Sequence, residues 1–177
     1  MRCYDLIYFY RGDKVDKNKS LEIIEKLSNA SGAPGFEDEV VEAIKVFGGE
    51  YGEISEDCLR NLYIRPRENS GTRPVVQLDA HSDEVAFMVQ YIMPNGTIKF
   101  TTLGSWVPYN IPAHLVRVRN GRGEYIPGIV ASKPPHFMTD TDKRNEVQLS
   151  SMVIDIGASS YEEAVRDYHI RIGEPIV

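Results

Sequence analysis

The sequence has few cysteines, no long apolar run and no excess of positive charge. Its two cysteines, Cys3 and Cys58, lack metal-site spacing, and a 20 kDa core does not need a disulfide, so a reducing cytoplasm is the predicted location. No stretch approaches the roughly 18 apolar residues of a membrane-spanning helix. Asp5 stands where the apolar part of a signal peptide would begin. Twenty Lys and Arg against 26 Asp and Glu give a net charge of −6, which repels phosphate backbones. We therefore expect a cytoplasmic protein with no nucleic-acid and no membrane partner.

A phosphate-binding glycine motif is also missing. Gly121-Arg122-Gly123 is not followed by Lys and Ser or Thr, so it predicts a hairpin turn. What is present is typical of a globular chain: 42% hydrophobic and 26% charged residues over 177 positions. That length suits one domain or two small ones.

The first half of the chain has the pattern of an α/β layer. Residues 1–19 read as an extension or linker, and Ser20 is the expected N-cap of a helix carrying an apolar stripe. A second helix is predicted at residues 37–47, ended by Gly48-Gly49. Strands are expected at residues 62–64 and 75–80, the second apolar enough to be buried in a sheet.

The second half has the pattern of an all-β domain. Asn95-Gly96 predicts a hairpin turn, and residues 120–123 predict another. Ser160 and Glu163 form a capping-box pattern that opens a short helix through about Tyr168. The pattern thus places an extension or linker at residues 1–19, an α/β part at 20–84 and a β-rich part from residue 85 onward.

The segment with the clearest chemical potential is Asp79-Ala80-His81-Ser82-Asp83-Glu84, at the end of the predicted buried strand. Ligands bind at the carboxyl ends of strands in α/β sheets. His81 there is a candidate metal ligand, and Asp83 can accept the N–H of its other ring nitrogen. A polar surface turn is the alternative interpretation of the same residues.

Other single residues carry weaker signals. Pro134-Pro135 stiffens the approach to His136, which suits a substrate contact, although a loop histidine held by a backbone carbonyl is the commoner outcome. His114 and His169 are expected to be structural or solvated. Cys58 is interpreted as a small buried side chain, and Trp106 as a packing anchor of the β-rich part.

Several motifs together resemble one family, the metal-dependent aminopeptidases related to glutamyl aminopeptidase, TET peptidases and endoglucanase M-like proteins. The first of them are Ala33-Pro34-Gly35-Phe36-Glu37-Asp38-Glu39-Val40, Asp57-Cys58-Leu59-Arg60-Asn61-Leu62 and Leu78-Asp79-Ala80-His81-Ser82-Asp83-Glu84-Val85. The others are Gly104-Ser105-Trp106 and residues 128–136, 154–158 and 172–177. The resemblance covers the chain from about Leu21 to Val177, and seven motifs in the right order make chance an implausible explanation.

The resemblance implies a fold and a chemistry. Family members have an α/β catalytic domain interrupted by a β-rich, PDZ-like domain that mediates dimerisation. By this resemblance residues 20–84 are a partial α/β catalytic domain, residues 85–172 the insertion and residues 173–177 the start of the return to the catalytic domain. His81 matches the first metal-ligand histidine and Asp83 the acid that orients it. Two divalent ions, zinc or cobalt, would activate the water that attacks the N-terminal peptide bond of a peptide substrate.

The sequence also departs from the family pattern. The family usually has Met in place of Ser82, and Gly in place of Ala86, Ser105 and Arg60. A side chain in place of Gly can disturb a turn that uses positive φ. The family's bridging aspartate, its pair of glutamates, its further acidic ligand and its last histidine all lie beyond the segment that ends at Val177. A metal centre needs about three protein ligands per ion, so we expect the 177-residue chain alone to be inactive.

Three functions remain open from the sequence. The first is the amino-terminal part of a metalloaminopeptidase, which would form a homo-oligomer or need its missing carboxyl-terminal half. The second is a non-catalytic module that self-associates through the β-rich domain. The third is a peptide-binding module that adds a peptide strand to a sheet edge.

Overall fold

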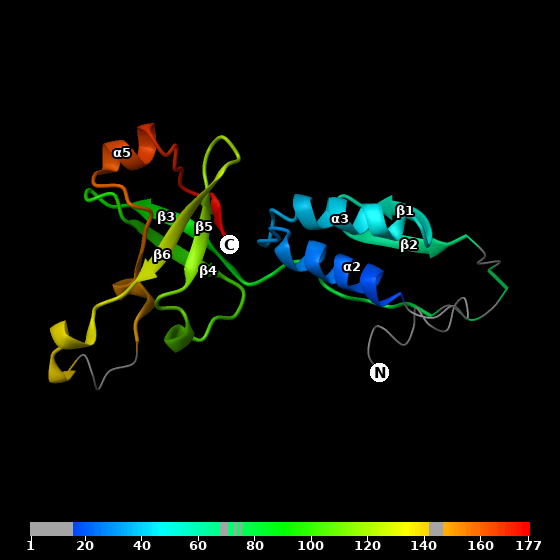
Figure 1. The fold of residues 1–177 in the computed structure, drawn as a ribbon, viewed down its shortest axis with the longest axis horizontal. Coiled ribbons are helices and arrows are strands. Elements are labelled where there is room, and N and C mark those ends of the chain that lie inside the picture. Colours follow the sequence, from blue (N-terminus) through cyan, green and yellow to red (C-terminus); the bar gives the residue numbers. More distant parts are fainter. Residues whose placement is uncertain (1–15, 68–70, 73, 75, 142–146) are drawn as a thin grey trace. The chain divides into compact units, whose positions relative to one another are not determined.

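A computed structural model describes residues 16–67, 71–72, 74, 76–141 and 147–177; predictions for residues 1–15 and for Val75 lie outside this range. The chain divides into two compact units. Unit 1 comprises Met1–Ser31 and Asp38–Ser82, and unit 2 comprises Gly32–Glu37 and Asp83–Val177. The helices and strands are, in order (Figure 1), α2 (Lys17–Asn29), α3 (Asp38–Gly48), β1 (Gly52–Glu56), β2 (Leu62–Pro66), β3 (Ala86–Ile92), β4 (Ile98–Leu103), β5 (Leu115–Arg119), β6 (Tyr125–Ala131), β7 (Val153–Asp155), α5 (Tyr161–Arg166) and β8 (Pro175–Ile176). The 3₁₀ turns η1 (Pro108–Asn110), η2 (Pro135–Phe137) and η3 (Leu149–Ser151) lie between the later strands.

The first helix of unit 1 begins earlier than the sequence predicted. The Asp16 carboxylate accepts hydrogen bonds from the amides of Asn18 and Lys19, at 2.9 and 3.3 Å, and so caps α2. Ser20, the predicted cap, lies inside the helix, and its hydroxyl donates to the Asp16 carbonyl at 2.9 Å. Residues 17–19 are therefore helix rather than linker, because the carboxylate of Asp16, four residues before the predicted cap Ser20, caps the helix.

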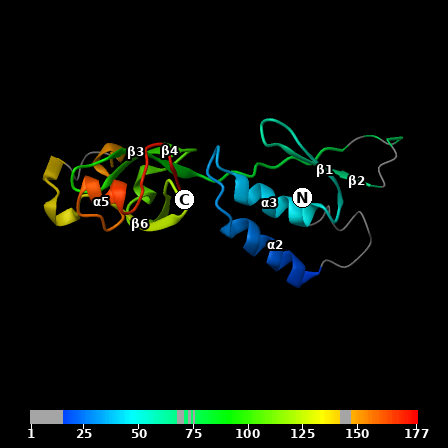
Figure 2. The same ribbon diagram turned by 90° about the horizontal axis from the view of Figure 1, so that it is seen from above.

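The second helix of unit 1 packs on a hairpin. The prediction of residues 37–47 is confirmed to within one residue by α3, which buries Val40 and Val41. Figures 1 and 2 show α3 beside α2, and strands β1 and β2 pair antiparallel. Gly48 is required where α3 meets the hairpin, because a Cβ there would lie 2.6 Å from the Ile64 Cδ1 atom. Strand β1 was not predicted, although Ile54 between polar neighbours carries the alternation of a strand.

The predicted buried strand at residues 75–80 is wrong for its described part. Residues 76–85 form no helix or strand, and Val76 and Leu78 are 77% and 66% exposed. A strand requires a hydrogen-bonding neighbour, and no described strand pairs with this segment. An apolar composition is therefore not sufficient for a strand here, because no described segment supplies the hydrogen-bonding partner.

Unit 2 is a closed six-stranded barrel with strand order β3-β4-β7-β6-β5-β8. Both predicted hairpins are confirmed: β3 pairs with β4 across Asn95-Gly96, and β5 pairs with β6 across residues 120–123. Gly96 has a φ of 86°, as its turn position requires.

The carboxyl-terminal residues differ from their predicted place. Residues 173–177 were expected to leave the β-rich domain, but Ile176 of β8 pairs with Phe87 of β3 and with Val118 of β5. This pairing closes the barrel, since the edges of β3 and β5 would otherwise be open. Peptide capture by strand addition, the third function considered, accordingly has no open edge at this position.

The barrel encloses one continuous hydrophobic core. The Phe87 ring stacks on Trp106, with centroids 4.5 Å apart, and meets the edge of Phe100 at 4.7 Å. The Trp106 indole donates to the Ala86 carbonyl at 3.0 Å, so the predicted packing role of Trp106 is confirmed. Other core residues that are at most 1% exposed are Val89, Ile98, Ile111, Val118, Val130, Met152, Ile154, Ala164, Ile170 and Ile176.

The capping box of α5 is half confirmed. The Ser160 hydroxyl accepts the Glu163 amide at 3.1 Å, as predicted. The Glu163 carboxylate, however, accepts from the amide and hydroxyl of Ser159, at 2.8 and 2.6 Å, rather than from the Ser160 amide. These bonds lower the pKa of Glu163. The helix ends at Arg166, two residues before the predicted end.

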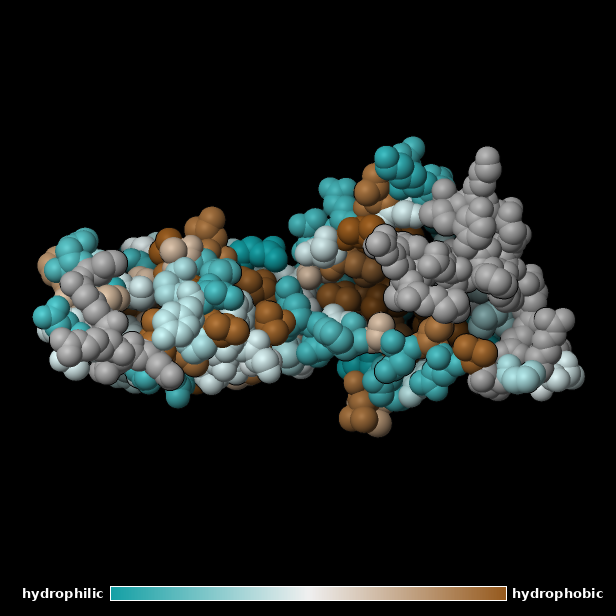
Figure 3. Space-filling view, turned by 90° about the horizontal axis from the view of Figure 1, so that it is seen from below, coloured by the Kyte–Doolittle hydropathy of each residue, from teal (hydrophilic) through white to brown (hydrophobic). Residues whose placement is uncertain are grey.

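Apolar residues of unit 1 reach its surface. Figure 3 shows hydrophobic residues gathered on one face of this unit. The large apolar residues of unit 1 that are more than a third exposed are Leu21, Ile24, Val46, Tyr51, Leu59, Tyr63, Ile64, Val76 and Leu78. Within the described ranges, no helix is both long and apolar enough to cross a membrane.

Candidate functional site

The candidate metal segment, residues 79–84, lies between β2 and β3 without regular secondary structure. His81 is exposed and Asp83 is partly buried. The division between the units falls between Ser82 and Asp83, so the two candidate residues belong to different units. Two residues after Glu84 the buried strand β3 begins, so the downstream end of the segment is tied to the barrel.

Glu84 fixes that downstream end to a distant part of the chain. Its backbone amide donates to the Gly32 carbonyl at 2.8 Å, and its carboxylate accepts the Gly32 amide at 3.0 Å. Gly32 is buried, and it lies 52 residues from Glu84 in sequence. Sequence reasoning did not identify this contact, because nothing local in the sequence connects the two residues.

The described residues do not make up a complete metal site. No three His, Cys, Asp or Glu side chains among them gather closely enough to hold a metal ion. His81 and Asp83 offer the donor chemistry of one imidazole ligand and one orienting acid, and a stable centre needs about three protein ligands per ion. The described side chains alone are too few to hold two metal ions.

His136, the candidate substrate contact, is exposed in η2. Its ring lies 4.7 Å from the ring of Phe137, which is 68% exposed. His136 belongs to unit 2 and His81 to unit 1.

The remaining residues singled out from the sequence have structural or solvated positions. His114 is exposed and its ring meets the edge of Trp106 at 6.0 Å. His169 adopts a φ of 57°, and its carbonyl accepts the Gly121 amide. Cys58 is exposed, so its interpretation as a small buried side chain is wrong; it lies in the turn between β1 and β2, which leaves its side chain in solvent.

That turn is organised by Asp57. One oxygen of its carboxylate accepts the amides of Leu59 and Asn61 at 2.9 and 3.0 Å. The other oxygen accepts the Asn61 side chain at 2.8 Å and the Tyr63 hydroxyl at 3.1 Å. The Asn61 side-chain bond, and then the backbone bonds, hold the pKa of Asp57 below its ordinary value, and Asp57 raises the pKa of Tyr63.

Arg60 occupies the strained position of the same turn. Its φ is 68°, which confirms that the position where the family usually has Gly uses positive φ. Its guanidinium pairs with Glu56 and Asp38. Glu56 also accepts from Lys45 at 3.0 Å, and this bond and Arg60 lower the pKa of Glu56. Ser105, by contrast, is not among the residues with positive φ, so the second departure from Gly places no strain there.

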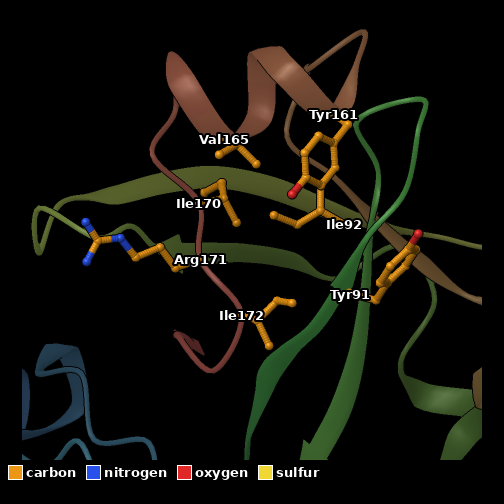
Figure 4. A pocket seen from close by; sticks show the side chains of 7 residues that line it. All are labelled: Tyr91, Ile92, Tyr161, Val165, Ile170, Arg171 and Ile172. Carbon is orange, nitrogen blue, oxygen red and sulfur yellow. The ribbon is translucent and has the colours of Figure 1, made fainter.

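A groove on unit 2 was not foreseen from the sequence. Figure 4 shows it beside α5. Two of its lining residues, Tyr91 and Ile92, end strand β3, just after a register shift between Val89 and Tyr91 in the pairing of β3 with β4. Its volume is about 260 Å³. The residues lining it are Tyr91, Ile92, Tyr161, Val165, Ile170, Arg171 and Ile172. Arg171 extends away from the apolar interior of the groove, over the turn at Gly121. The lining is chiefly apolar. Its polar side chains are those of Tyr91, Tyr161 and Arg171, and it includes no His, Cys, Ser, Asp, Glu or Lys.

Comparison with known proteins gives a consistent result. The putative aminopeptidase FrvX of Escherichia coli K12 is 37% identical over 145 residues, which are 81% of this chain and 40% of FrvX. A TET aminopeptidase structure from a marine sediment thaumarchaeote superposes with a TM-score of 0.81 at 37% identity, covering 90% of this chain and 44% of that one. A dodecameric PhTET1 structure shares the fold, with a TM-score of 0.69 at 22% identity, over 89% of this chain and 44% of that one.

The chain therefore spans about two fifths of the length of the relatives that it matches. The sequence pattern of the M42 glutamyl aminopeptidase family matches residues 61–177. The resemblance seen in the sequence motifs is thereby confirmed, and the chain belongs to the M42 glutamyl aminopeptidase family.

Proposed function

We propose that this chain supplies the amino-terminal share of a metal-dependent aminopeptidase that removes N-terminal residues from peptides. The observation that carries the proposal is the family match over residues 61–177, which includes the His81 and Asp83 segment. The 37% identity to FrvX, itself described as a putative aminopeptidase, supports the same chemistry.

His81 is proposed as a ligand of one divalent ion, with Asp83 as the acid that orients its imidazole. The family resemblance implies two such ions, zinc or cobalt, which when bound would lower the pKa of a water molecule and polarise the scissile carbonyl. The chain's own part is to present one imidazole with a fixed tautomer. Because the described residues supply no further ligand cluster, hydrolysis would depend on residues outside them. By itself the chain is proposed to be inactive. His136 is retained as a proposed substrate contact.

Unit 2 is proposed to be the β-rich insertion of the family, PDZ-like and used in self-association. Its closed barrel and short helix α5 form a domain with a core of its own, as such an insertion requires. The dodecameric PhTET1 structure shares the fold of the chain, which is compatible with a homo-oligomer here.

Unit 1 is proposed to be the opening of the catalytic domain, completed by further polypeptide. Val46, Leu59 and Leu78 are between 66% and 78% exposed, and apolar residues exposed together on one unit mark a surface that another segment covers. The missing carboxyl-terminal part of the catalytic domain is the proposed partner, with a second copy of the chain as the other possible cover.

The proposal is tested by supplying the missing part. The chain is mixed with the carboxyl-terminal three fifths of FrvX, and hydrolysis of aminoacyl p-nitroanilides is measured with Zn²⁺ or Co²⁺. We expect activity from the mixture, none from either part alone, and a loss of at least about a hundredfold in His81→Ala. His114→Ala is the matched control, since His114 is also exposed. Full activity of the His81→Ala mixture would contradict the assignment of His81.

The coding DNA beyond Val177 offers an independent check. A downstream segment that encodes an aspartate-rich turn, a Glu-Glu pair and a final His would support the aminopeptidase proposal. Metal analysis of the purified chain checks the incompleteness of the site. More than about one tightly held ion per chain would contradict it, since a single imidazole does not retain zinc.

A further inference from the structure

The chain passes between the two units at three points: after Ser31, after Glu37 and after Ser82. The hexapeptide between the first two, Gly32–Glu37, is part of unit 2 although its flanking residues belong to unit 1. Something must therefore hold this hexapeptide on the barrel. Its contacts within unit 2 show what does so.

At its first residue, Gly32, the hexapeptide is held by Glu84 through two bonds that run in opposite directions. The Glu84 amide donates to the Gly32 carbonyl at 2.8 Å, and the Gly32 amide donates to the Glu84 carboxylate at 3.0 Å. Both polar groups of one buried backbone unit are thus satisfied by one residue. The second of these bonds has a charged acceptor, which makes it stronger than a neutral one.

Towards its other end, Phe36 provides a second attachment. The Arg119 guanidinium lies over the Phe36 ring, 5.7 Å from its centroid. Arg119 is itself 3.7 Å from Glu174, in the segment that leads into β8. The turn between these attachments is closed by the Phe36 amide, which donates to the Ala33 carbonyl at 2.8 Å.

Glu84 is also tied to the core on its downstream side. Ala86, two residues later, is 1% exposed, and its carbonyl accepts the Trp106 indole N–H. The position of Glu84 is thus set by the barrel core on one side and by Gly32 on the other. The residue immediately before it is Asp83, and His81 lies three residues upstream.

We propose that Glu84 is the positioning residue of the His81–Asp83 segment, acting through its two-bond contact with Gly32. This proposal rests on the function proposed above, in which His81 and Asp83 serve the metal centre. Glu84 itself touches neither metal nor substrate in this assignment. One oxygen of its carboxylate accepts the Gly32 amide, and this bond gives the segment after Ser82 one fixed path.

The test compares Glu84→Ala with Glu84→Gln in the full 177-residue chain. The glutamine amide keeps an oxygen that can accept the Gly32 amide, whereas alanine removes the acceptor. In Glu84→Ala we expect amide exchange at Gly32 to accelerate at least about tenfold. We also expect the backbone order parameter of Asp83 to fall from the rigid range near 0.85 towards 0.6. In Glu84→Gln both should stay close to those of the unchanged chain.

Two controls keep this result interpretable. Glu22→Ala removes an exposed glutamate from α2 and should change neither quantity. Exchange at the core amides of Val118 and Ile154 should be unchanged in all variants, which shows that the barrel remains folded. Unchanged exchange at Gly32 in Glu84→Ala, or equal acceleration in Glu84→Gln, would overturn the positioning role.

A Zn²⁺ titration separates this inference from the proposed function. The His81 ring resonances are followed as Zn²⁺ is added to the chain mixed with the carboxyl-terminal three fifths of FrvX, because the described residues alone supply too few ligands to retain the ion. If His81 is a ligand, its resonances shift, and Glu84→Ala weakens the apparent affinity several-fold while Glu84→Gln does not. Absence of any shift would contradict the metal role of His81, whereas the exchange result at Gly32 would still decide the contact made by Glu84.

Discussion

The two units differ in how completely their apolar side chains are buried. In unit 2, Phe87, Ile98 and Ile154 are at most 1% exposed and belong to one continuous core. In unit 1, Val40 and Val41 are buried, whereas apolar residues of comparable size, such as Leu59 at 78% exposed, face solvent. The strands of unit 2 are also more completely paired, since its barrel is closed. Strands β1 and β2 of unit 1, in contrast, form a sheet of two strands only.

This difference shows which part of the chain has a stability of its own. A two-stranded sheet is marginal without further strands or a well-packed helix, and helix α2 has no buried residue. Unit 1 depends on polar links instead. Lys45 of α3 contacts Glu42 on the same helix at 2.7 Å, and it joins α3 to β1 by contacting Glu56 at 3.0 Å. Surface ion pairs of this kind stabilise only weakly. We infer that unit 2 unfolds as one cooperative body and that unit 1 opens locally.

The largest expected effect comes from Phe87→Ala in the barrel core. Removal of a buried ring that contacts Phe100 and Trp106 should lower the free energy of unfolding of unit 2 by about 3–5 kcal/mol. Urea unfolding followed by circular dichroism and by fluorescence of Trp106, the single tryptophan, measures it. Leu115→Ala, at a position 83% exposed, is the control and should change stability by no more than about 0.5 kcal/mol. If Phe87→Ala lowers the free energy of unfolding by less than about 1 kcal/mol, the conclusion that unit 2 has the more strongly packed core is wrong.

A smaller effect on the same unit is expected from Ser160→Ala. The Ser160 hydroxyl caps α5 by accepting the Glu163 amide, and loss of such a cap costs about 0.5–2 kcal/mol. If unit 2 unfolds cooperatively, the whole unfolding transition measured by Trp106 fluorescence shifts to a lower urea concentration. Ser150→Ala at an exposed site outside any α-helix serves as the comparison. A change confined to α5, with the barrel transition in place, would show that the helix unfolds separately.

In unit 1 we expect Arg60→Gly to be more stable than Arg60→Ala by about 1 kcal/mol. Both variants lose the ion pairs with Glu56 and Asp38, but only alanine keeps the unfavourable positive φ. Amide exchange in β1 and β2 reports the difference, and the Trp106 transition should not move. Equal exchange in the two variants would mean that the turn relaxes away from positive φ.

The smallest effect is an acid-induced loosening of the Asp57 turn. The pKa of Asp57 is lowered in the folded chain, so its carboxylate stabilises the turn fully above the unfolded-state value of 3.8. That stabilisation is lost as the pH falls through the lower, folded value. The Asn61 amide resonance should therefore titrate with a midpoint below 3.8, and in Asp57→Asn this step should disappear. A midpoint at or above 3.8 in the unchanged chain would contradict the assigned hydrogen bonds. Glu56 and Tyr63, the titratable neighbours, keep their own steps in both variants.

Local sequence signals predicted the elements whose stabilising contacts are themselves local. Asn95-Gly96 specifies its hairpin because the turn needs positive φ, and Ser160 specifies the start of α5 because its partner lies three residues on. The start of α2 was misplaced because two competent caps, Asp16 and Ser20, lie four residues apart. The choice between them depends on the path of the chain before the helix.

Long-range contacts could not be read in the same way. Residues 76–80, predicted as part of a buried strand, form none, because no described strand pairs with them. Strand β8 has two residues, and their pairing with β3 and β5 closes the barrel. At the candidate site, His81 and Asp83 were identified by their spacing and by the family resemblance. The link from Glu84 to Gly32 spans 52 residues and has no sequence signature.

The sequence by itself determined the family, the segment that carries the candidate metal ligand, and the division of the chain into a helical first half and a hairpin-rich second half. Periodicity and turn residues are local properties, each complete within a few residues, and the order of short motifs can be read directly along the chain. Only the tertiary structure decided that Gly32–Glu37 joins the barrel, that residues 175–176 close it, and that the apolar residues of unit 1 remain exposed. Those outcomes depend on which distant groups satisfy each other's hydrogen bonds and cover each other's surface, and that is a property of the folded chain as a whole.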